Sequence, residues 1–364
     1  MSKIRDVAHN LYGGQVSYDF VGKTKVWYLI SGIILAVTIG SLIFRGLNLG
    51  IEFKGGAEFQ IPASQCTVEQ VRTTVNTDLG GSAIVTQLGD GSLRVQTETV
   101  SNEQGNTLTQ ALGQECGVAA NDIKIQVVGP TWGSEVSKKA LQGLVVFLIL
   151  VSIFLAIYFE WRMAVAALVA LAHDLIITIG VYSILGFEVT PATAIGLLTI
   201  LGYSLYDTVV VFDKVKENTQ GILGQSRLTY SEAANLAINQ TLIRSINTSI
   251  VALLPVAAIL FVGAGLLGAG TLKDLALALF VGMAAGTYSS IFVATPFLVQ
   301  LKNREPEVQA LERRVLSRRR KSDDAQEALE EAAVGGGAKG VSRTITETGV
   351  RQQPKRQSRS KRRQ

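Results

Sequence analysis

The fold of this chain is decided by the stretch GYSLYDTVVVFDKVKEN, residues 202–218, which places an acidic residue inside an otherwise apolar segment. That residue is Asp207. A charged side chain at the centre of a membrane helix costs roughly 2.5–3.5 kcal/mol on insertion scales. Such a residue is retained where another part of the protein uses or neutralises it, so Asp207 is a candidate functional residue whose partner must lie elsewhere in the chain.

The composition indicates a polytopic membrane protein. Of the 364 residues, 48% are hydrophobic, and they gather in long blocks. The formal net charge of +5 comes from the ends and one loop, which relates to topology and anionic lipid and predicts no specific nucleic-acid partner. Two cysteines and two histidines argue against a metal cluster, and no nucleophile is paired with a base. We therefore predict neither an enzyme nor a cofactor or metal site.

Six apolar runs are long enough to cross a membrane. About 20 helical residues, at roughly 1.5 Å each, span a hydrocarbon core of about 30 Å. The first run, residues 26–45, follows the N-terminal segment 1–25 and shows no small-residue cleavage pattern, so it predicts an uncleaved anchor. The other five lie within residues 139–300, with a polar loop at 213–245; they are expected at about 140–159, 163–185, 191–212, 248–267 and 275–299.

The basic residues of the short loops predict the orientation in the membrane. Lys and Arg are enriched in loops that stay in the cytoplasm. Arg162 lies between the second and third spans, and Lys214, Lys216 and Arg227 lie between the fourth and fifth. We therefore predict a multi-pass protein with both termini in the cytoplasm and residues 46–138 on the exported side.

The pattern within residues 46–138 predicts an α+β domain. An alternating run at 51–61 reads as a strand and residues 67–80 as a capped helix. A hairpin signal around 89–91, a second helix at 106–117 and a last strand at 122–129 follow. The order β-α-β-β-α-β is that of a ferredoxin-like, split βαβ arrangement.

Cys66 and Cys116 fall at the same end of such a domain. A disulfide between them is compatible with an oxidising compartment. The residues leave this choice open, and we favour two unpaired cysteines in the domain core over the disulfide.

The C-terminal segment, residues 301–364, is expected to be a disordered cytoplasmic tail. From residue 302 onward it carries 17 Lys and Arg against nine Asp and Glu, with almost no aromatic residues. Such a composition buries too little apolar surface to fold alone. We expect it to lie on anionic lipid, with ribosomal RNA or an acidic protein partner as alternatives.

Two further charged residues lie near Asp207 in depth. Asp174 is about 16 Å into the third span, near the bilayer centre, and Asp207 is about 9 Å from the cytoplasmic end of the fourth. Arg244 enters the fifth span at a depth close to that of Asp207. The long side chain of Arg244 could reach Asp207. We predict that Asp207 and Arg244 form a pair and that Asp174 is a further station of a proton relay.

Proton transport needs a buried carboxylate whose proton affinity a movable cation can change. The alternative is a static ion pair that ties two spans together. His173, next to Asp174, is expected to point elsewhere on its helix and to serve packing. The polar side chains expected to support the relay are Tyr203, Ser204, Thr208, Asn247 and Thr248.

Two glycine patterns predict no ligand. GAGLLGAGTLKD, residues 263–274, lacks the Lys-Ser/Thr that ends a phosphate loop. Gly282 and Gly286 form a GxxxG, which is typical of a helix-packing face.

Three motifs together resemble a known family. GLNLGIEFKGG (46–56), the long stretch 172–218 and TLIRSINTS (241–249) are similar to SecF, a member of the SecD/SecF family of bacterial protein-export membrane proteins in the resistance-nodulation-division superfamily. The resemblance covers residues 20–300. It implies one half of a 12-helix assembly in the bacterial cytoplasmic (inner) membrane.

The resemblance also implies a function and partners. SecD would supply the other six spans, and the pair would use the proton motive force in late translocation and release of preproteins. SecYEG, SecA and YajC are further partners that the family implies. Asp207 falls on the family's essential aspartate, Arg244 on the arginine thought to answer it, and Asp174 in a His-Asp motif. Tyr206 departs from the usual Asn before the aspartate.

The leading hypothesis is therefore a proton-driven subunit of the Sec protein-export machinery. The alternative is a structural subunit without a motor function that stabilises the translocon complex. A small-molecule or lipid exporter is disfavoured because the predicted exported domain offers no apolar pocket.

Overall fold

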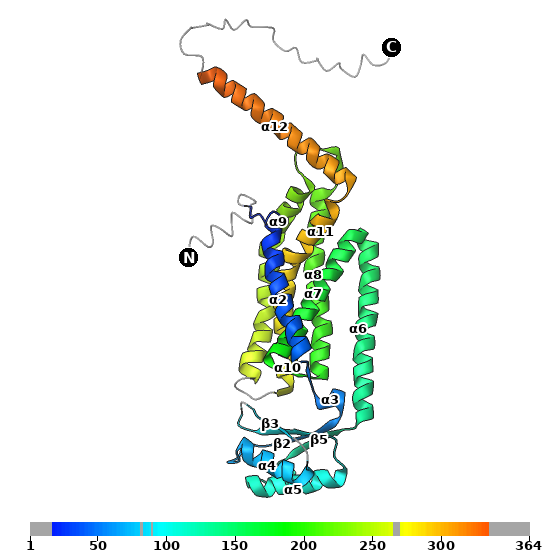
Figure 1. The fold of residues 1–364 in the computed structure, drawn as a ribbon, viewed down its shortest axis with the longest axis vertical. Helices are drawn as coiled ribbons and strands as arrows, with labels where there is room; N and C mark the ends of the chain where they lie inside the picture. Colours follow the sequence, from blue (N-terminus) through cyan, green and yellow to red (C-terminus); the bar gives the residue numbers. More distant parts are fainter. Residues whose placement is uncertain (1–16, 81–82, 89, 265–269, 335–364) are drawn as a thin grey trace, which may run out of the picture. The chain divides into compact units, whose positions relative to one another are not determined.

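The computed structural model describes residues 17–80, 83–88, 90–264 and 270–334. The chain divides into two compact units, residues 1–315 and 316–364. The membrane helices and the α/β domain both belong to the first unit (Figure 1). The described part of the second unit is the C-terminal portion of a single helix.

Six helical segments of the described residues are long and apolar enough to cross a membrane, as the predicted fold class requires. The last of them is interrupted by a π-helical stretch, η4, and a second π-helical stretch, η3 (Ile259–Ala264), follows the fifth. The segments are α2 (Thr24–Phe44), α6 (Pro130–Tyr158), α7 (Trp161–Leu185), α8 (Pro191–Thr219), α9 (Tyr230–Ala258) and α10 (Gly270–Ser289), the last continued by η4 (Ser290–Ala294) and α11 (Thr295–Lys302).

Local capping signals set the connection between α7 and α8. Gly186, with φ of 70°, ends α7 in the left-handed conformation that favours glycine. The two-residue strand β6 (Glu188–Val189) follows. Thr190 then caps α8 by accepting a hydrogen bond from the Thr193 backbone N–H, and Pro191 takes the first helical position. β6 is thus the short link between two membrane helices.

Two helices begin earlier than their apolar residues indicate. α6 starts at Pro130, ahead of the expected start near residue 140. α9 starts at Tyr230 in one continuous helix, because Thr229 and Glu232 form a capping box well before the apolar run at 248. Hydropathy marks the part of a helix that suits lipid, whereas the cap marks where the backbone becomes helical.

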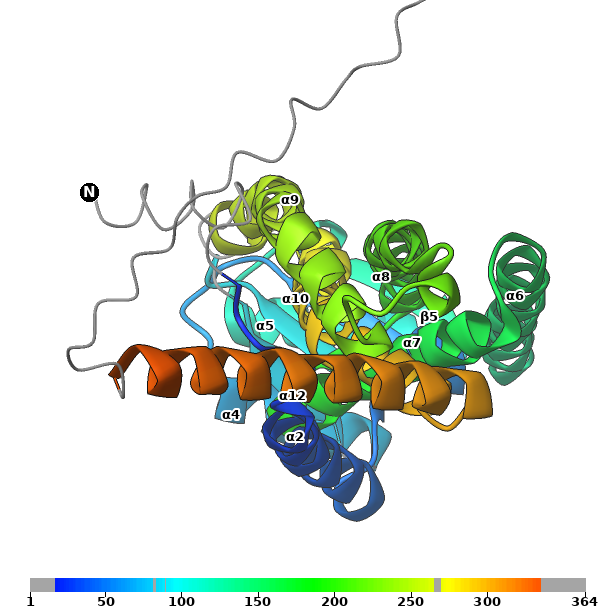
Figure 2. The same ribbon diagram turned by 90° about the horizontal axis from the view of Figure 1, so that it is seen from above.

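The helix α10 packs closely against α8 through its glycines. A side chain at Gly282 would overlap Ile200, and a Cβ at Gly286 would lie 2.8 Å from Ser204 Cβ. The predicted helix-packing role of this GxxxG is therefore confirmed. By contrast, α6 lies at the edge of the bundle (Figure 2): its Leu155 is buried in the main core, whereas Leu141 and Ile157 are exposed.

The α/β domain has the predicted element order, but the strand predicted at 51–61 begins only at Gly56. Residues 51–54 form the short helix α3 (Ile51–Lys54), and the positive φ of Gly55 and Gly56 turns the chain from this helix into the strand. The domain consists of a four-stranded antiparallel sheet in the order β3-β4-β2-β5, with two helices in the crossover connections. This order agrees with a ferredoxin-like arrangement. The elements are β2 (Gly56–Ile61), α4 (Val68–Leu79), β3 (Ile84–Gln87), β4 (Leu93–Thr97), α5 (Asn102–Cys116), the 3₁₀ turn η1 (Ala120–Asp122) and β5 (Lys124–Val128).

The two faces of the sheet differ in chemistry. Phe59 of β2 and Val95 of β4 are buried in a core shared with α4 and α5 (Figure 1). Because side chains alternate along a strand, Glu58, Arg94 and Gln96 lie on the opposite, polar face. A short segment before the sheet, β1 (Asn48–Leu49) and α3 (Ile51–Lys54), leads from α2 into β2.

The glycine pair at the end of the motif 46–56 joins α3 to β2. Gly55 has φ of 81° and Gly56 has φ of 151°, both in the region that favours glycine. A Cβ at Gly56 would also come within 2.6 Å of the Thr97 carbonyl oxygen. The pair therefore permits the tight turn that starts the sheet.

The two cysteines form a disulfide, so the preference for unpaired cysteines was wrong. Cys66 and Cys116 are joined at an S–S distance of 2.07 Å, with a sequence separation of 50. Cys66 precedes α4 and Cys116 ends α5, and both pack on the domain core. The argument from topology located the pair correctly, but a free cysteine also packs well in a core, so residue type alone could not decide.

The segment after the last span is helical, which contradicts the predicted disordered tail over residues 306–334. Helix α12 runs from Pro306 to Val334. Val308, Leu311 and Val315 are buried in the main core of the first unit, at helical spacing. The average composition of the tail concealed this short apolar stripe. Residues 335–364 lie outside the described part of the chain.

Candidate proton-relay site

The three predicted relay residues come from three adjacent helices. Asp174 of α7 is 1% exposed and Asp207 of α8 is 5% exposed, so both carboxyls are buried in the bundle. Arg244 of α9 is exposed. The structure thus brings two of the three predicted residues into the interior.

Asp207 is held by two serine hydroxyls. Ser245 Oγ on α9 donates to Asp207 Oδ1 at 2.6 Å. Ser290 Oγ donates to Asp207 Oδ2. Ser290 is the first residue of η4, and π-helical turns within α-helices recur at functional sites because they redirect side chains.

Asp174 is held in a similar way. Ser204 Oγ on α8 donates to Asp174 Oδ2 at 2.5 Å, and Ser289 Oγ donates to the same oxygen at 2.8 Å. His173 Nδ1 lies 3.1 Å from Asp174 Oδ1. The expectation that His173 points elsewhere was therefore wrong, although its ring also packs against Tyr288. The imidazole Nε2 is buried and has no hydrogen-bond partner in the described part of the chain.

Two consecutive serines each donate to one of the two carboxyls. Ser289 bonds to Asp174 and Ser290 bonds to Asp207, from the junction of α10 with η4. A hydroxyl both donates and accepts hydrogen bonds, so it can take a proton on one lone pair while giving up its own. The arrangement places two carboxyls in contact with one continuous polar segment inside an apolar bundle.

The predicted pair of Asp207 with Arg244 is not formed. No ion pair joins them among the described residues. Arg244 instead donates to the Tyr206 hydroxyl at 3.4 Å on the exposed surface. Ser245, the next residue after Arg244, contacts Asp207, so α9 comes level with Asp207 at this point. One step around α9 separates the inward Ser245 from the outward Arg244.

The predicted supporting residues divide into two groups. Ser204 contacts Asp174, and Thr208 is buried with no hydrogen-bond partner for its hydroxyl in the described part of the chain. Tyr203, Asn247 and Thr248 make no hydrogen bond to either aspartate within the described residues.

Sequence reasoning missed Ser245, Ser289 and Ser290. All three are small hydroxyl residues in apolar spans, and the paired serines within GTYSSIF at 286–292 were the available signal. Serine is common in membrane helices, where it bonds to its own backbone, so its type alone does not mark a site.

Metal and nucleotide chemistry receive no support from the described residues. Within them, no group of three His, Cys, Asp or Glu side chains could hold a metal ion. The glycine-rich run at 263–274 falls partly on residues 265–269, which lie outside the described part of the chain.

Comparison with known families assigns the chain. Residues 107–304 match the family described as protein export membrane protein SecD/SecF, C-terminal, and residues 40–65 match the SecD/SecF GG motif. The chain belongs to the SecF family of protein translocase subunits. The GG motif contains the Gly55–Gly56 turn, and the longer match contains all of the hydroxyl and carboxyl groups described above.

Curated relatives and a solved structure agree. The chain is 53% identical over 334 residues to protein translocase subunit SecF of Streptomyces coelicolor, covering 92% of this chain and 90% of that protein. It is 46% identical to SecF of Mycobacterium tuberculosis, covering 90% of this chain and 76% of the relative. A crystal structure of SecDF from Thermus thermophilus superposes with a TM-score of 0.72 at 33% identity, over 80% of this chain and 39% of that one.

Proposed function

We propose that the chain uses the proton motive force, together with a SecD-type partner, to assist late steps of preprotein translocation. The observation that carries this proposal is the pair of buried carboxyls, Asp174 and Asp207, bound by the adjacent hydroxyls of Ser289 and Ser290. A buried carboxylate without a cation is costly, and hydroxyl donors offset only part of that cost. Loading and unloading of a proton at such a site changes the packing of the helices around it.

The direction of the proton flow follows from the proposed topology. Basic short loops support cytoplasmic termini, which would place the α/β domain on the exported side of the bacterial cytoplasmic membrane. The proton motive force makes that side the source of protons. Protons would then pass through the bundle toward the cytoplasm by way of Asp174 and Asp207.

A SecD-type partner would complete the assembly. The chain matches 39% of the solved SecDF chain, so the remainder of that chain has no counterpart here. Arg244 and the half-exposed Tyr206 lie side by side on the outer surface of α8 and α9. We propose that this surface meets the partner and that Arg244 reaches the carboxyl of Asp207 in another state of the transport cycle.

The exchange Asp207→Asn tests the proposal, with Asp213→Asn as its matched control. Both residues lie on α8, but Asp213 is exposed. Export of a preprotein is measured in sealed vesicles containing the full complex, with and without a protonophore. We expect D207N to assemble normally and to lose the protonophore-sensitive part of export, whereas D213N keeps it.

The structural-subunit alternative gives the opposite result. If D207N vesicles retain undiminished protonophore-sensitive export, the carboxyl is not a proton carrier. If D207N fails to assemble with its partner, the carboxyl serves assembly, and the motor proposal loses its main support.

A further inference from the structure

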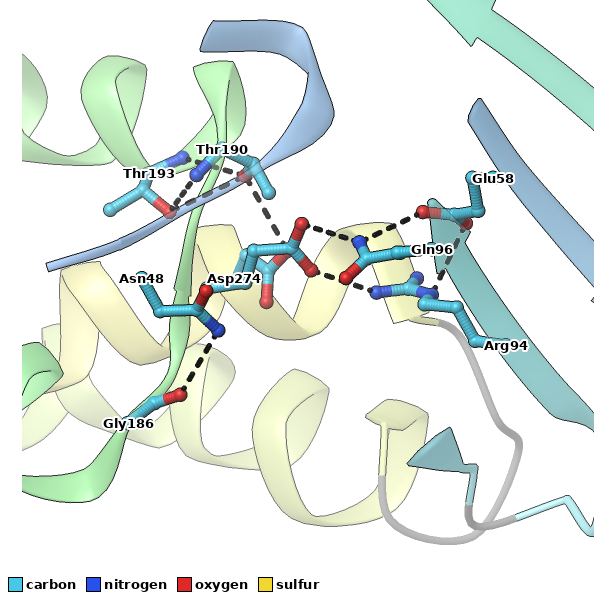
Figure 3. Close-up of polar contacts among 9 residues, drawn as sticks. Asn48, Glu58, Arg94, Gln96, Gly186, Thr190, Thr193 and Asp274 are labelled. Atoms are coloured by element: carbon cyan, nitrogen blue, oxygen red, sulfur yellow. Dashed lines mark hydrogen bonds and ion pairs between the residues drawn. The ribbon is translucent and has the colours of Figure 1, made fainter. Parts of the chain in front are cut away.

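Charged side chains join the α/β domain to the link between α7 and α8. Gln96 Nε2 donates to Glu188 Oε1 at 2.6 Å. Arg94 lies 3.3 Å from Glu188 Oε2 and 3.2 Å from Glu58 Oε1. In Figure 3 one dashed line from Arg94 and one from Gln96 end on the unlabelled carboxylate beside the Asp274 label, which these two hydrogen bonds identify as that of Glu188. We call Glu58, Arg94, Gln96 and Glu188 the charged joint.

Backbone contacts place β6 against the segment that leads into the domain. β1 pairs with β6 in parallel, with Asn48 opposite Glu188. The Gly50 N–H donates to the Val189 carbonyl at 2.9 Å. Arg45, at the end of α2, donates to the Ile184 carbonyl at 2.8 Å. The main chain of β6 is thus held by β1, and its one acidic side chain is held by the sheet.

Carboxylates outnumber cations at the charged joint. Counting its neighbours, the charged joint has four carboxylates, one each from α3, β2, β6 and α10. Besides Arg94, the nearby cations are Lys273 of α10 and Arg45, which lies at the 184–186 turn. The carboxylates are those of Glu52, Glu58, Glu188 and Asp274. One oxygen of Glu52 is buried with no hydrogen-bond partner in the described part of the chain. Like charges at low dielectric repel strongly, so the contact is under electrostatic strain when all four are ionised.

Burial raises the pKa of Glu188 above its ordinary value, and the charges of Glu58 and Glu52 raise it further. Gln96 and Arg94 act in the opposite direction but do not cancel the effect of burial. Release of the domain would return Glu188 to water. Its pKa is therefore higher in the docked arrangement than in the released one.

The position of β6 connects the charged joint to the buried aspartates. β6 follows α7, which carries Asp174, and precedes α8, which carries Asp207. Only the Gly186–Phe187 turn and Thr190 separate it from those helices. A shift of α8 relative to α7 would therefore displace β6 and, with it, the side chain of Glu188.

We propose that the charged joint is a pH-dependent contact, which we call the clasp. Protonation of Glu188, from the side of the membrane that carries the α/β domain, stabilises the contact of the domain with β6. Loss of that proton weakens the contact. The step moves one proton between solvent and a carboxylate, and no other bond forms or breaks. The clasp goes beyond the proposed function, because its docking equilibrium exists without proton transport. Only the expectation that the proton motive force acidifies this side rests on that function.

The sign of the pH dependence follows from linkage. A group whose pKa is higher in the docked arrangement favours docking, and this contribution is complete below the pKa of the released group. It disappears as the pH rises through the docked pKa. The domain is therefore held most firmly at acidic pH, and the docked share falls toward neutral pH.

Distances between spin labels test the clasp in the full chain in lipid nanodiscs. Both native cysteines are in the disulfide, so labels attach only to introduced thiols. Thr77→Cys on α4 and Leu185→Cys at the end of α7 are exposed positions on the two sides of the contact. Double electron–electron resonance at pH 5 and pH 7.5 then gives the docked and released populations. We expect the short-distance population to decrease as the pH rises.

Glu188→Gln carries the decisive comparison. The amide keeps a hydrogen-bond acceptor for Gln96 but cannot ionise, so E188Q should remain docked at both pH values. Arg94→Met should increase the released population at pH 7.5, because it removes the cation that faces the ionised carboxylates. The exposed Glu103→Gln on α5 is the control and should retain the wild-type pH profile.

The proposal is overturned if wild type and E188Q give the same distance distributions at both pH values, or if E188Q releases the domain. These readouts do not depend on export. A failure here leaves the Asp207 experiment untouched, and the converse also holds.

Discussion

Removal of the disulfide should destabilise the α/β domain by a predictable amount. The bond between Cys66 and Cys116 closes a loop with a sequence separation of 50 residues. In the chain-entropy description, closing a loop of this length removes conformational freedom from the unfolded chain that is worth about 4 kcal/mol at 25 °C. Since small domains are stable by only about 5–15 kcal/mol, this loss would remove between roughly a quarter and four-fifths of the domain's stability.

The double substitution Cys66→Ala and Cys116→Ala tests this value. With a denaturant slope of roughly 1–3 kcal/mol per molar urea, a loss of about 4 kcal/mol lowers the unfolding midpoint by about 2 M. The midpoint is measured by pulse proteolysis of the full chain in nanodiscs, following cleavage within residues 46–138. Wild type treated with reductant is the matched control and should behave like the double variant.

Mass mapping under non-reducing conditions comes first, because it shows whether the peptides containing Cys66 and Cys116 are linked. The reasoning is refuted if the linkage is present but the midpoint moves by less than about 0.5 M on its removal. That outcome would mean that the unfolded domain is already compact enough to gain nothing from the bridge.

Two further predictions concern the membrane helices. Ser290→Ala removes one of the two hydroxyl donors to Asp207. Since hydrogen bonds to charged groups are worth about 1.5–3 kcal/mol, we expect the protonophore-sensitive part of export to fall roughly tenfold or more. Ser290→Thr should restore it. Unchanged coupling in the alanine variant would contradict a role for this hydroxyl. Gly282→Leu should force α10 from α8, because its side chain would overlap Ile200. We expect the free energy of thermal unfolding in detergent to fall by about 1–3 kcal/mol or more. Gly202→Leu, with open space around it, should have no such effect, and equal effects of the two variants would disprove the close approach.

The resemblance and the residues together anticipated much of the fold. Long apolar runs predicted six membrane-crossing helices, and alternating and helical periodicities predicted the element order of the α/β domain. These patterns are local, because a helix or strand shows its buried face in the spacing of its own side chains. Helix α12 escaped notice because its buried stripe, from Val308 to Val315, is short and lies in a strongly basic segment.

Asp207 shows where reasoning from sequence stops at the candidate site. An acid in an apolar run has to be buried or partnered, and the structure confirms that Asp207 and Asp174 are buried. The nearest residue of opposite charge in depth, Arg244, is nevertheless on the surface, and its neighbour Ser245 takes the inward position. Opposite charge at the same depth suggests which residues could pair. Which of two adjacent residues faces the partner depends on how each helix is rotated about its axis.

By itself, the sequence determined which segments suit lipid, where strands and helices alternate, and that two carboxyls lie inside the membrane bundle. Only the tertiary structure decided that serines of the last span hold both carboxyls, that the cysteines are joined, and that Arg94 and Glu188 meet across the joint. Hydrophobic burial depends on the residues of one segment, so its pattern can be read along the chain. A hydrogen bond between segments depends on the rotation and approach of both, which the packing of the whole bundle sets.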